Sequence, residues 1–378
     1  MADRSEPRPI VPLVLVGLGV FLLVVAILMP TYMTGRLEKT PLDLEITTVS
    51  TGTGTVLNAA SLTAGRAQID QNVPLVSQRF VTTEEPSDSD TITVQAGSTL
   101  RRTDKQGDTG LLTALVDRVS ADRKTAMPVD PVGTIQAQGD KPAEEVPHTG
   151  LQYKFPFGAE QKTYPFFDTV ARQSFDMNFV EETEINGLPV YHYTQTIAPV
   201  DLSTVVNLPT NKLALPADTW GVPGGSVPIT MTRFYENTRN IYVEPKTGVI
   251  VKGEEAVHQY YARRAETPDV DVLNATIGFD DNSVDFQLGK AREGIDQISL
   301  ISRTIPIIAA IVGLISLLVG LFLLFFRKGR GTPATASGPR TSTAPPSAAR
   351  PARGENRDFG DERTEEIPRT DLRKPPQQ

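Results

Sequence analysis

Six aromatic side chains are concentrated in one short stretch of the sequence, LQYKFPFGAEQKTYPFFD, which runs from Leu151 to Asp168. They are Tyr153, Phe155, Phe157, Tyr164, Phe166 and Phe167. The apolar residues at its start recur at every second position, which predicts a β-strand with one apolar face. Such a face could form the wall of an apolar ligand-binding cavity for an acyl chain, or stack against a sugar. Packing into an ordinary hydrophobic core is the favoured alternative, because aromatic side chains bury large areas.

Other residues that could carry chemistry are sparse. The three histidines, His148, His192 and His258, lie in separate segments without the spacing of a zinc motif. The absence of cysteine excludes disulfides and thiolate chemistry. Acidic residues gather at Glu84–Asp90 and Phe279–Asp285, but the second segment lacks the full spacing of a calcium loop, so we interpret both as solvated. The sequence therefore predicts no catalytic residue, no metal ligand and no cofactor.

Two long apolar runs place these residues relative to a membrane. They extend from Ile10 to Met29 and from Ile305 to Phe326, and neither contains a charged residue. About 20 residues of helix cross the ~30 Å hydrocarbon layer, so both runs are predicted to be transmembrane helices. The first run is longer than the apolar part of a signal peptide, and no small-residue cleavage site follows it. We interpret it as an uncleaved anchor.

Basic residues beside the two runs predict their orientation. Arg327, Lys328 and Arg330 follow the second run, and Arg4 and Arg8 precede the first. Because basic residues favour the cytoplasmic side, both termini are predicted to be cytoplasmic and the protein to lie in the plasma membrane. The expected organisation is then a cytoplasmic N-terminus (1–9), a helix (10–29), an extracytoplasmic domain (30–304), a helix (305–326) and a tail (327–378).

Charge and composition distinguish the tail from the central region. The formal net charge of the whole chain is −8, and the central region is acidic whereas the tail is basic. An acidic outer domain is a poor partner for nucleic acid. The tail is rich in Pro, Ala, Ser and Thr between residues 331 and 353. A segment of this composition cannot bury enough apolar surface to fold, so the tail is predicted to be disordered.

The central region reads mainly as β-structure. Segments rich in β-branched and aromatic residues predict strands at 91–97, 188–197, 240–262 and 270–279, and TGTGTVLN (51–58) is interpreted as a strand of small residues. Turns are expected at Asn186-Gly187 and at Glu244–Gly248. The segment DRKTAMPV (122–129) resembles EPKTGVIV (244–251), which similar turn chemistry explains without a duplication.

Two further segments are candidates for helices. Residues 110–119 fit either a strand or a short helix. Apolar residues at helical spacing predict a helix over 283–304, with Ser283 as its N-cap, that continues into the second membrane span. The predicted fold class is therefore α+β: a mainly β extracytoplasmic domain flanked by N-terminal and C-terminal transmembrane helices, with a disordered C-terminal tail.

Three segments between the two spans carry a family resemblance. LQYKFPFGAEQKTYPFFD, NGLPVYHY and NTRNIYVEPKTGVIVKGEE together resemble the porin PorA family of actinobacterial membrane proteins, over residues 10–326. The resemblance implies two membrane spans and offers no catalytic residues to carry over. A membrane-spanning barrel closes with strands alone, whereas two helices already account for membrane attachment here.

The residues and the resemblance together suggest several functions. The first is a non-enzymatic cell-envelope protein accessory to lipid or lipoglycan handling, such as lipomannan or lipoarabinomannan maturation. Its partners would be a membrane lipid or lipoglycan and other envelope-assembly proteins. The alternatives are an oligomeric channel or porin, a glycan-active enzyme with two converging carboxylates, and a sensor that signals through the tail.

Overall fold

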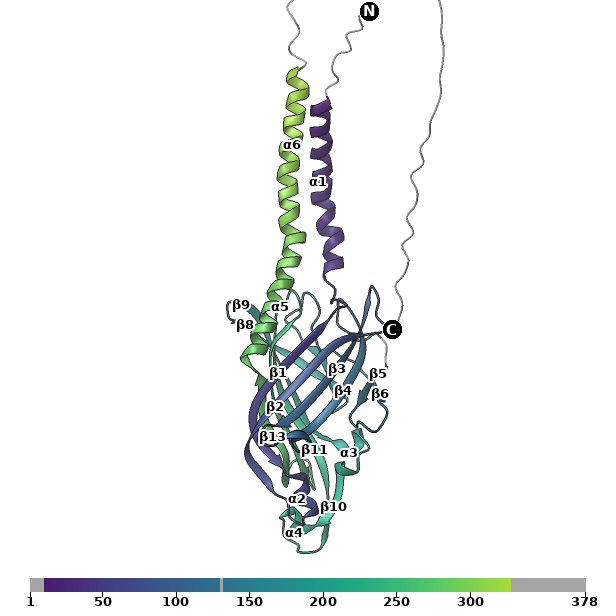
Figure 1. The fold of residues 1–378 in the computed structure, drawn as a ribbon, viewed down its shortest axis with the longest axis vertical. Helices are drawn as coiled ribbons and strands as arrows, with labels where there is room; N and C mark the ends of the chain where they lie inside the picture. The colour runs from purple at the N-terminus through teal and green to yellow at the C-terminus, as the bar shows by residue number, and fades with distance from the viewer. Residues whose placement is uncertain (1–9, 130–131, 328–378) are drawn as a thin grey trace, which may run out of the picture. The chain divides into compact units, whose positions relative to one another are not determined.

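The computed structural model describes residues 10–129 and 132–327 of the chain, and the first unit of the chain ends at Arg327. The predictions for residues 1–9 and 328–378 lie outside the described residues. The first unit holds an antiparallel β-sheet and the two long apolar helices (Figure 1). The predicted fold class, a mainly β domain flanked by two helices apolar enough to span a membrane, is confirmed.

The β domain is one 13-stranded sheet with the order β6-β5-β4-β3-β2-β1-β13-β12-β11-β9-β8-β7, and β10 pairs with β11 outside this path. The strands are β1 (Glu45–Leu57), β2 (Ile69–Glu84), β3 (Thr91–Arg102), β4 (Leu111–Asp122), β5 (Val132–Gln136), β6 (Glu144–Pro147), β7 (Tyr164–Asp168), β8 (Gln173–Ile185), β9 (Leu188–Asp201), β10 (Lys212–Pro216), β11 (Pro228–Val243), β12 (Ile250–Ala262) and β13 (Val270–Phe279). All the strands that the sequence predicts at 91–97, 188–197, 240–262 and 270–279 are present.

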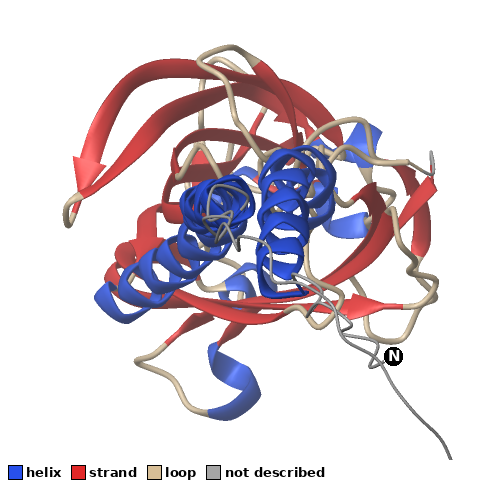
Figure 2. Cartoon of the chain, turned by 90° about the horizontal axis from the view of Figure 1, so that it is seen from above, coloured by secondary structure: helices blue, strands red, loops and turns tan. Residues whose placement is uncertain are grey.

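The sheet curls around an interior, as the view from above shows (Figure 2). Its two ends meet through side chains, because Phe167 of β7 packs with Ile135 of β5 and Val146 of β6. The Arg172 guanidinium adds an ion pair of 2.7 Å to Glu144 of β6. Because the terminal strands are joined by packing, the curled sheet forms a nearly closed wall and leaves little edge for pairing with another chain.

Three helical segments follow one another at the C-terminal end of the domain. They are α5 (Asp281–Ser299), a π-helical turn (η3, Leu300–Thr304) and α6 (Ile305–Arg327), so the predicted continuation into the second span is confirmed. The N-cap differs from the prediction: the Asp280 carboxylate accepts from the Ser283 backbone N–H, and the Ser283 hydroxyl accepts from Val49 N–H of β1. The longer Asp side chain thus caps the helix, which frees Ser283 to attach α5 to the sheet.

Helices α1 (Ile10–Leu37) and α6 pack against each other through small residues. A Cβ at Gly19 would lie 2.7 Å from the Leu317 nitrogen, and one at Gly313 would lie 3.0 Å from the Gly19 oxygen. The Ser316 hydroxyl donates to the Leu15 carbonyl at 2.9 Å. These contacts pair the start of α1 with the later part of α6, so the helices are antiparallel, with close backbone contact typical of membrane helices.

Short helical segments complete the domain. They are α2 (Ala59–Thr63), α3 (Leu202–Val205), α4 (Ala217–Trp220) and the 3-10 turns η1 (Gly107–Gly110) and η2 (Pro209–Asn211). The undecided segment at 110–119 is a strand, because β4 pairs with β3 along most of its length. The small residues of β1 are explained by its neighbour: a Cβ at Gly52 would lie 2.1 Å from the Thr276 oxygen of β13.

The two similar segments of the sequence form matching turns. Asp122 accepts from the backbone N–H groups of Lys124 and Thr125, and Glu244 accepts in the same way from the residues two and three positions later. Ala126, at a φ of 58°, occupies the position that Gly248 occupies at 72°. The interpretation as similar turns is therefore confirmed.

The predicted strand at the start of the aromatic stretch is absent. Only Leu151 makes a β-bridge, to Phe166, and residues 155–159 run as an irregular segment across the two turns. The Phe155 N–H donates to the Gly248 carbonyl at 2.9 Å, and the Phe157 N–H donates to the Lys124 carbonyl at 3.0 Å. The alternation of apolar residues is real, but the backbone partners of this segment are turns rather than a strand.

Candidate functional site: the internal cavity

The β domain contains a partly open cavity of about 1910 Å³. This volume exceeds the ~300–1,000 Å³ of ordinary small-molecule pockets. Its lining includes Leu37, the last residue of α1, and Ile298 of α5, and it also includes Ala59 of α2 and Leu208. Helix α5 continues into the membrane helices, whereas α2 lies at the opposite end of the domain (Figure 1). The cavity therefore extends along the length of the domain.

Apolar and polar side chains alternate along the strands that line the cavity. On β2, Ser77, Arg79 and Val81 face the cavity, whereas the neighbouring Gln78 and Phe80 are exposed on the opposite face. The same period of two holds on β11, whose inward positions include Arg233 and Arg239. The interior is thus neither a dry core nor a water channel, because it combines apolar wall with charged groups.

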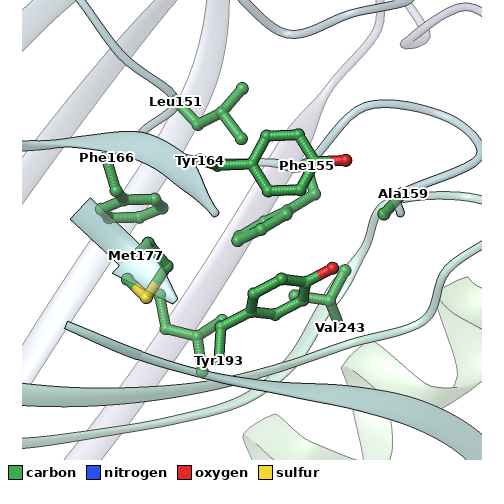
Figure 3. Close-up of a cluster of buried hydrophobic side chains, with 9 residues drawn as sticks. Leu151, Phe155, Ala159, Tyr164, Phe166, Met177, Tyr193 and Val243 are labelled. Atoms are coloured by element: carbon green, nitrogen blue, oxygen red, sulfur yellow. The ribbon is translucent and has the colours of Figure 1, made fainter. Parts of the chain in front are cut away.

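The six predicted wall residues divide between this cavity and a packed core. Tyr153, Phe157, Phe166 and Phe167 line the cavity, whereas Phe155 and Tyr164 are buried in a hydrophobic cluster with Tyr193 and Met177 (Figure 3). The Phe155 ring lies 4.7 Å from that of Tyr193 and 5.4 Å from that of Tyr164. Phe166 belongs to both environments, because it is part of the cluster and also lies in the cavity wall.

Tyr153 and His148 converge on the buried Asp117. His148 Nε2 lies 2.8 Å from Asp117 Oδ1, and the Tyr153 hydroxyl and the Gln152 amide both donate to Oδ2. The His148 ring also stacks on Phe167 at 4.1 Å. Burial, and next the Asp117 charge, raise the pKa of the Tyr153 hydroxyl well above its usual value. This network holds the aromatic segment against β4 where the sheet closes.

A second network occupies the middle of the cavity. The Arg239 guanidinium donates to Asp168 at 2.9 Å, to Glu255 at 2.9 Å and to Gln195 at 2.6 Å. Asp168 also accepts from the Tyr235 hydroxyl at 2.8 Å. Burial alone would raise the pKa of Glu255, but the positive charge of Arg239 outweighs it and the pKa is lowered. The arginine is therefore compensated by two carboxylates.

These carboxylates converge in a cavity, as a glycan-active enzyme would require, but their environment does not suit that chemistry. A glycosidase needs one carboxylic acid with a raised pKa to protonate the leaving group. The pKa of Glu255 is lowered instead, and Asp168 is 1% exposed with both oxygens engaged by backbone, tyrosine and arginine donors. The arrangement is that of a structural ion-pair network.

Lys154 brings a cation to the membrane-proximal part of the cavity wall. Its ammonium donates to the Phe155 carbonyl at 3.0 Å and lies 3.6 Å from the centre of the Phe157 ring. Burial lowers the pKa of Lys154 to about 7, and the more distant Glu244 charge only partly opposes this shift. No ion pair to Lys154 occurs in the described part of the chain.

Arg233 is a further cation in the wall, six residues before Arg239 on the same face of β11. One of its Nη atoms donates to the Gln259 amide oxygen at 2.5 Å, whereas its Nε is buried without a hydrogen-bond partner. Burial lowers the pKa of Arg233. Across residues 10–129 and 132–327, it makes no ion pair with a carboxylate.

The remaining histidines lie in other surroundings. His192 stacks on Tyr242, and His258 bridges Glu236 and Asp271 at 2.8 Å each. Among the residues that the structure describes, no group of three or more His, Cys, Asp or Glu side chains is placed to hold a metal ion. The acidic segment at 279–285 forms the end of β13 and the start of α5, where Asp280 serves as the helix cap.

Sequence reasoning missed the charged interior. Arg233, Arg239 and Glu255 lie on strands whose outward positions are also polar, so alternation does not reveal which face is inside. A usable signal was present in RFYENTR, where two arginines fall six positions apart and therefore on one face of a strand.

The comparison with known proteins agrees with the two-span architecture. The family model described as porin PorA matches residues 11–322. The chain belongs to the porin PorA family. The predicted resemblance is thus confirmed, and the two apolar helices together with the family identify a membrane protein.

Two relatives from this family match over nearly their whole lengths. A protein named porin PorA from Corynebacterium resistens is 31% identical over 409 residues, which cover 85% of this chain and 98% of the relative. Another protein of the same name, from Corynebacterium amycolatum, is 30% identical over 371 residues, covering 81% of this chain and 96% of the relative.

Proposed function

We propose that this chain is a membrane-anchored conduit of the porin type. Its β domain would take a molecule into the internal cavity and pass it between the far end of the domain and the membrane surface. The extent of the cavity, from Ala59 and Leu208 to Leu37 and Ile298, is the observation that carries this proposal. The porin names of the two relatives support the same class and favour it over an accessory role in lipoglycan maturation.

Passage across the bilayer would require several copies of the chain. The two helices of one copy are in close backbone contact at Gly19 and Gly313, so the pair encloses no continuous channel. Outward-facing side chains of both helices are apolar and suited to lipid or to neighbouring helices. In this proposal, oligomers supply the pore through the membrane, and each β domain supplies the route to it.

The orientation in this proposal follows from the basic residues. The start of α1 and the end of α6 lie at the same end of the antiparallel pair, as the contact of Ser316 with Leu15 requires. Arg327 and the basic residues that follow it favour the cytoplasmic side. We therefore place both termini in the cytoplasm and the β domain outside the plasma membrane.

Handling of a membrane lipid or lipoglycan is a second candidate. It is supported by the apolar part of the cavity wall, such as Leu213, Leu215 and Val272, and by the lining residues Leu37 and Ile298 beside the membrane helices. The two functions differ in outcome: a conduit passes ions or solutes across a bilayer, whereas a lipid carrier binds its cargo without conductance.

Planar-bilayer recording of a singly labelled protein tests the conduit. Because the natural chain has no cysteine, Ser77→Cys introduces one thiol into the cavity, and Gln78→Cys introduces one on the opposite face of the same strand. We expect conductance from both variants, and block by a bulky thiol reagent only for Ser77→Cys. Absence of conductance, or equal sensitivity of the two variants, would refute the conduit.

A further inference from the structure

The guanidinium of Arg233 lies in the cavity wall without the partners that a buried charge usually has. In the described part of the chain it has no carboxylate partner, its Nε has no hydrogen-bond partner, and Gln259 is the acceptor of its hydrogen bond. Its cross-strand neighbour is Tyr261, whose hydroxyl donates to the Thr210 carbonyl instead. A half-buried guanidinium without a counter-charge is destabilising relative to one that is paired.

Most arginines of the cavity wall have a carboxylate partner, whereas Arg79, like Arg233, donates to an uncharged group, the Ser98 hydroxyl. Arg239 is held by Asp168 and Glu255, and Arg102 is held by Asp70 and Asp104 at 2.7 Å each. The protein therefore compensates buried arginines where their role is structural. Arg233 lies on the same strand as Arg239 and, unlike it, has no carboxylate partner in the described residues.

The surroundings of Arg233 are apolar. Leu213 and Leu215 of β10, with Tyr261 and Val272, line this end of the cavity and belong to one hydrophobic cluster. A ligand whose anionic group met Arg233 would therefore extend along apolar wall. A free inorganic anion would gain the charge contact but would leave this wall uncovered.

We propose that Arg233 binds the anionic head group, a carboxylate or a phosphate, of an amphiphile whose apolar chain lies along the cavity. This inference rests on the second candidate function, handling of a membrane lipid in the cavity, and names the chemical class of that cargo. The head group supplies the missing counter-charge, and the planar guanidinium suits a two-oxygen contact. The apolar chain of the amphiphile covers the leucines of β10 and points toward the middle of the cavity.

Fluorescence of the single tryptophan provides the readout. Trp220 packs in the same cluster, with its ring 5.1 Å from that of Tyr261, the cross-strand neighbour of Arg233. We would titrate the full chain in nanodiscs with palmitate, hexadecanol, acetate and inorganic phosphate, and subtract the signal of empty nanodiscs. Arg233→Met and Arg233→Lys would be compared with Arg264→Met, which changes an exposed arginine outside the cavity wall.

We expect wild type and Arg264→Met to bind palmitate, and Arg233→Met to bind it about 10- to 100-fold more weakly with hexadecanol binding unchanged. Arg233→Lys keeps the charge but loses the two-oxygen contact, so its affinity for palmitate should lie between those of wild type and Arg233→Met. Arg233→Met should also melt at the same or a higher temperature, because it removes an uncompensated charge. A purely structural arginine would show the reverse, a lower melting temperature.

Three results would overturn the inference. Equal loss of palmitate and hexadecanol binding in Arg233→Met, with an unchanged melting temperature, would mean that Arg233 shapes the cavity wall and does not contact a head group. Acetate or phosphate competing as well as palmitate would mean a small-anion site. Palmitate binding that is absent or indifferent to Arg233 would exclude the head-group contact, while block of Ser77→Cys conductance would still uphold the conduit.

Discussion

Arg233 and Arg239 lie six residues apart on the same face of β11, but their hydrogen-bond and ion-pair partners differ. Arg239 donates to two carboxylates and an amide, whereas Arg233 donates to one amide and has no ion-pair partner in the described residues. A buried charge is tolerated when it is compensated, and an uncompensated one must be kept for another reason. The middle of the cavity is therefore built for stability, and the far end retains a cost that a ligand can remove.

The largest expected effect is the loss of the compensated arginine. Arg239→Met leaves Asp168 and Glu255 buried without their counter-charge, and we expect it to destabilise the domain by about 3–5 kcal/mol. Thermal or urea unfolding of the purified protein measures this change. Arg233→Met is the matched control, and destabilisation of similar size there would remove the distinction between the two arginines.

The aromatic stretch permits the same comparison with uncharged residues. Phe155 is fully buried among Tyr164, Tyr193 and Met177, whereas Phe157 is only partly buried and lines the cavity. Truncation of a packed aromatic costs about 3–5 kcal/mol, so Phe155→Ala should be severely destabilised. For Phe157→Ala we expect about 1–2 kcal/mol, because less surface is buried. Equal losses in urea unfolding would show that the cavity side is packed as tightly as the core.

Lys154 extends the comparison to a cation that responds to pH. Its pKa is lowered to about 7 in the folded protein, whereas an unfolded lysine titrates near 10.4. The buried charge of Lys154 therefore lowers the free energy of unfolding fully below pH 7. This destabilisation decreases as the pH rises from 7 toward the pKa of the unfolded lysine. Lys154→Met should be more stable than wild type at pH 6 by about 1–3 kcal/mol, with no difference at pH 10.5. A pH-independent difference in unfolding free energy between Lys154→Met and wild type would contradict this account.

The smallest expected effect concerns the two turns that hold the aromatic stretch. Ala126 adopts a positive φ where the matching turn has Gly248, so Ala126→Gly should relieve strain and stabilise the domain by about 0.5–1 kcal/mol. Gly248→Ala should destabilise it, because the new Cβ would lie 2.1 Å from the Phe155 oxygen. Unfolding that is insensitive to both changes would mean that the turns do not constrain the stretch.

The elements that could be predicted from the sequence are those that local residue patterns determine. Charge-free runs predicted both membrane helices, and turn residues predicted the hairpin at Asn186-Gly187 and the turn at Glu244–Gly248. The strand predicted at Leu151–Phe157 was wrong, because alternation reports which side chains are buried and not which backbone groups pair. Leu151 alone pairs with a strand, β7, whereas Phe157 and Phe155 are hydrogen-bonded to turns about 30 and 90 residues away in the chain.

The interior could not be predicted in the same way. A pattern of alternating residues shows two faces but does not show whether a curled sheet leaves space between them. The aromatic residues therefore stayed ambiguous between core and wall, and the structure assigns Phe155 and Tyr164 to the first and Phe157 to the second. The role of Arg233 depends on a partner that is missing nearby, which only the three-dimensional arrangement reveals.

Photo-crosslinking with a diazirine-bearing palmitate tests the central claim most directly. Mapping of the adducts on the full-length protein by mass spectrometry should place them on the cavity wall around Leu213, Leu215 and Val272, and Arg233→Met should reduce them. Adducts confined to the lipid-facing surfaces of α1 and α6, and unchanged in Arg233→Met, would show that the amphiphile meets only the membrane anchor and would contradict the account.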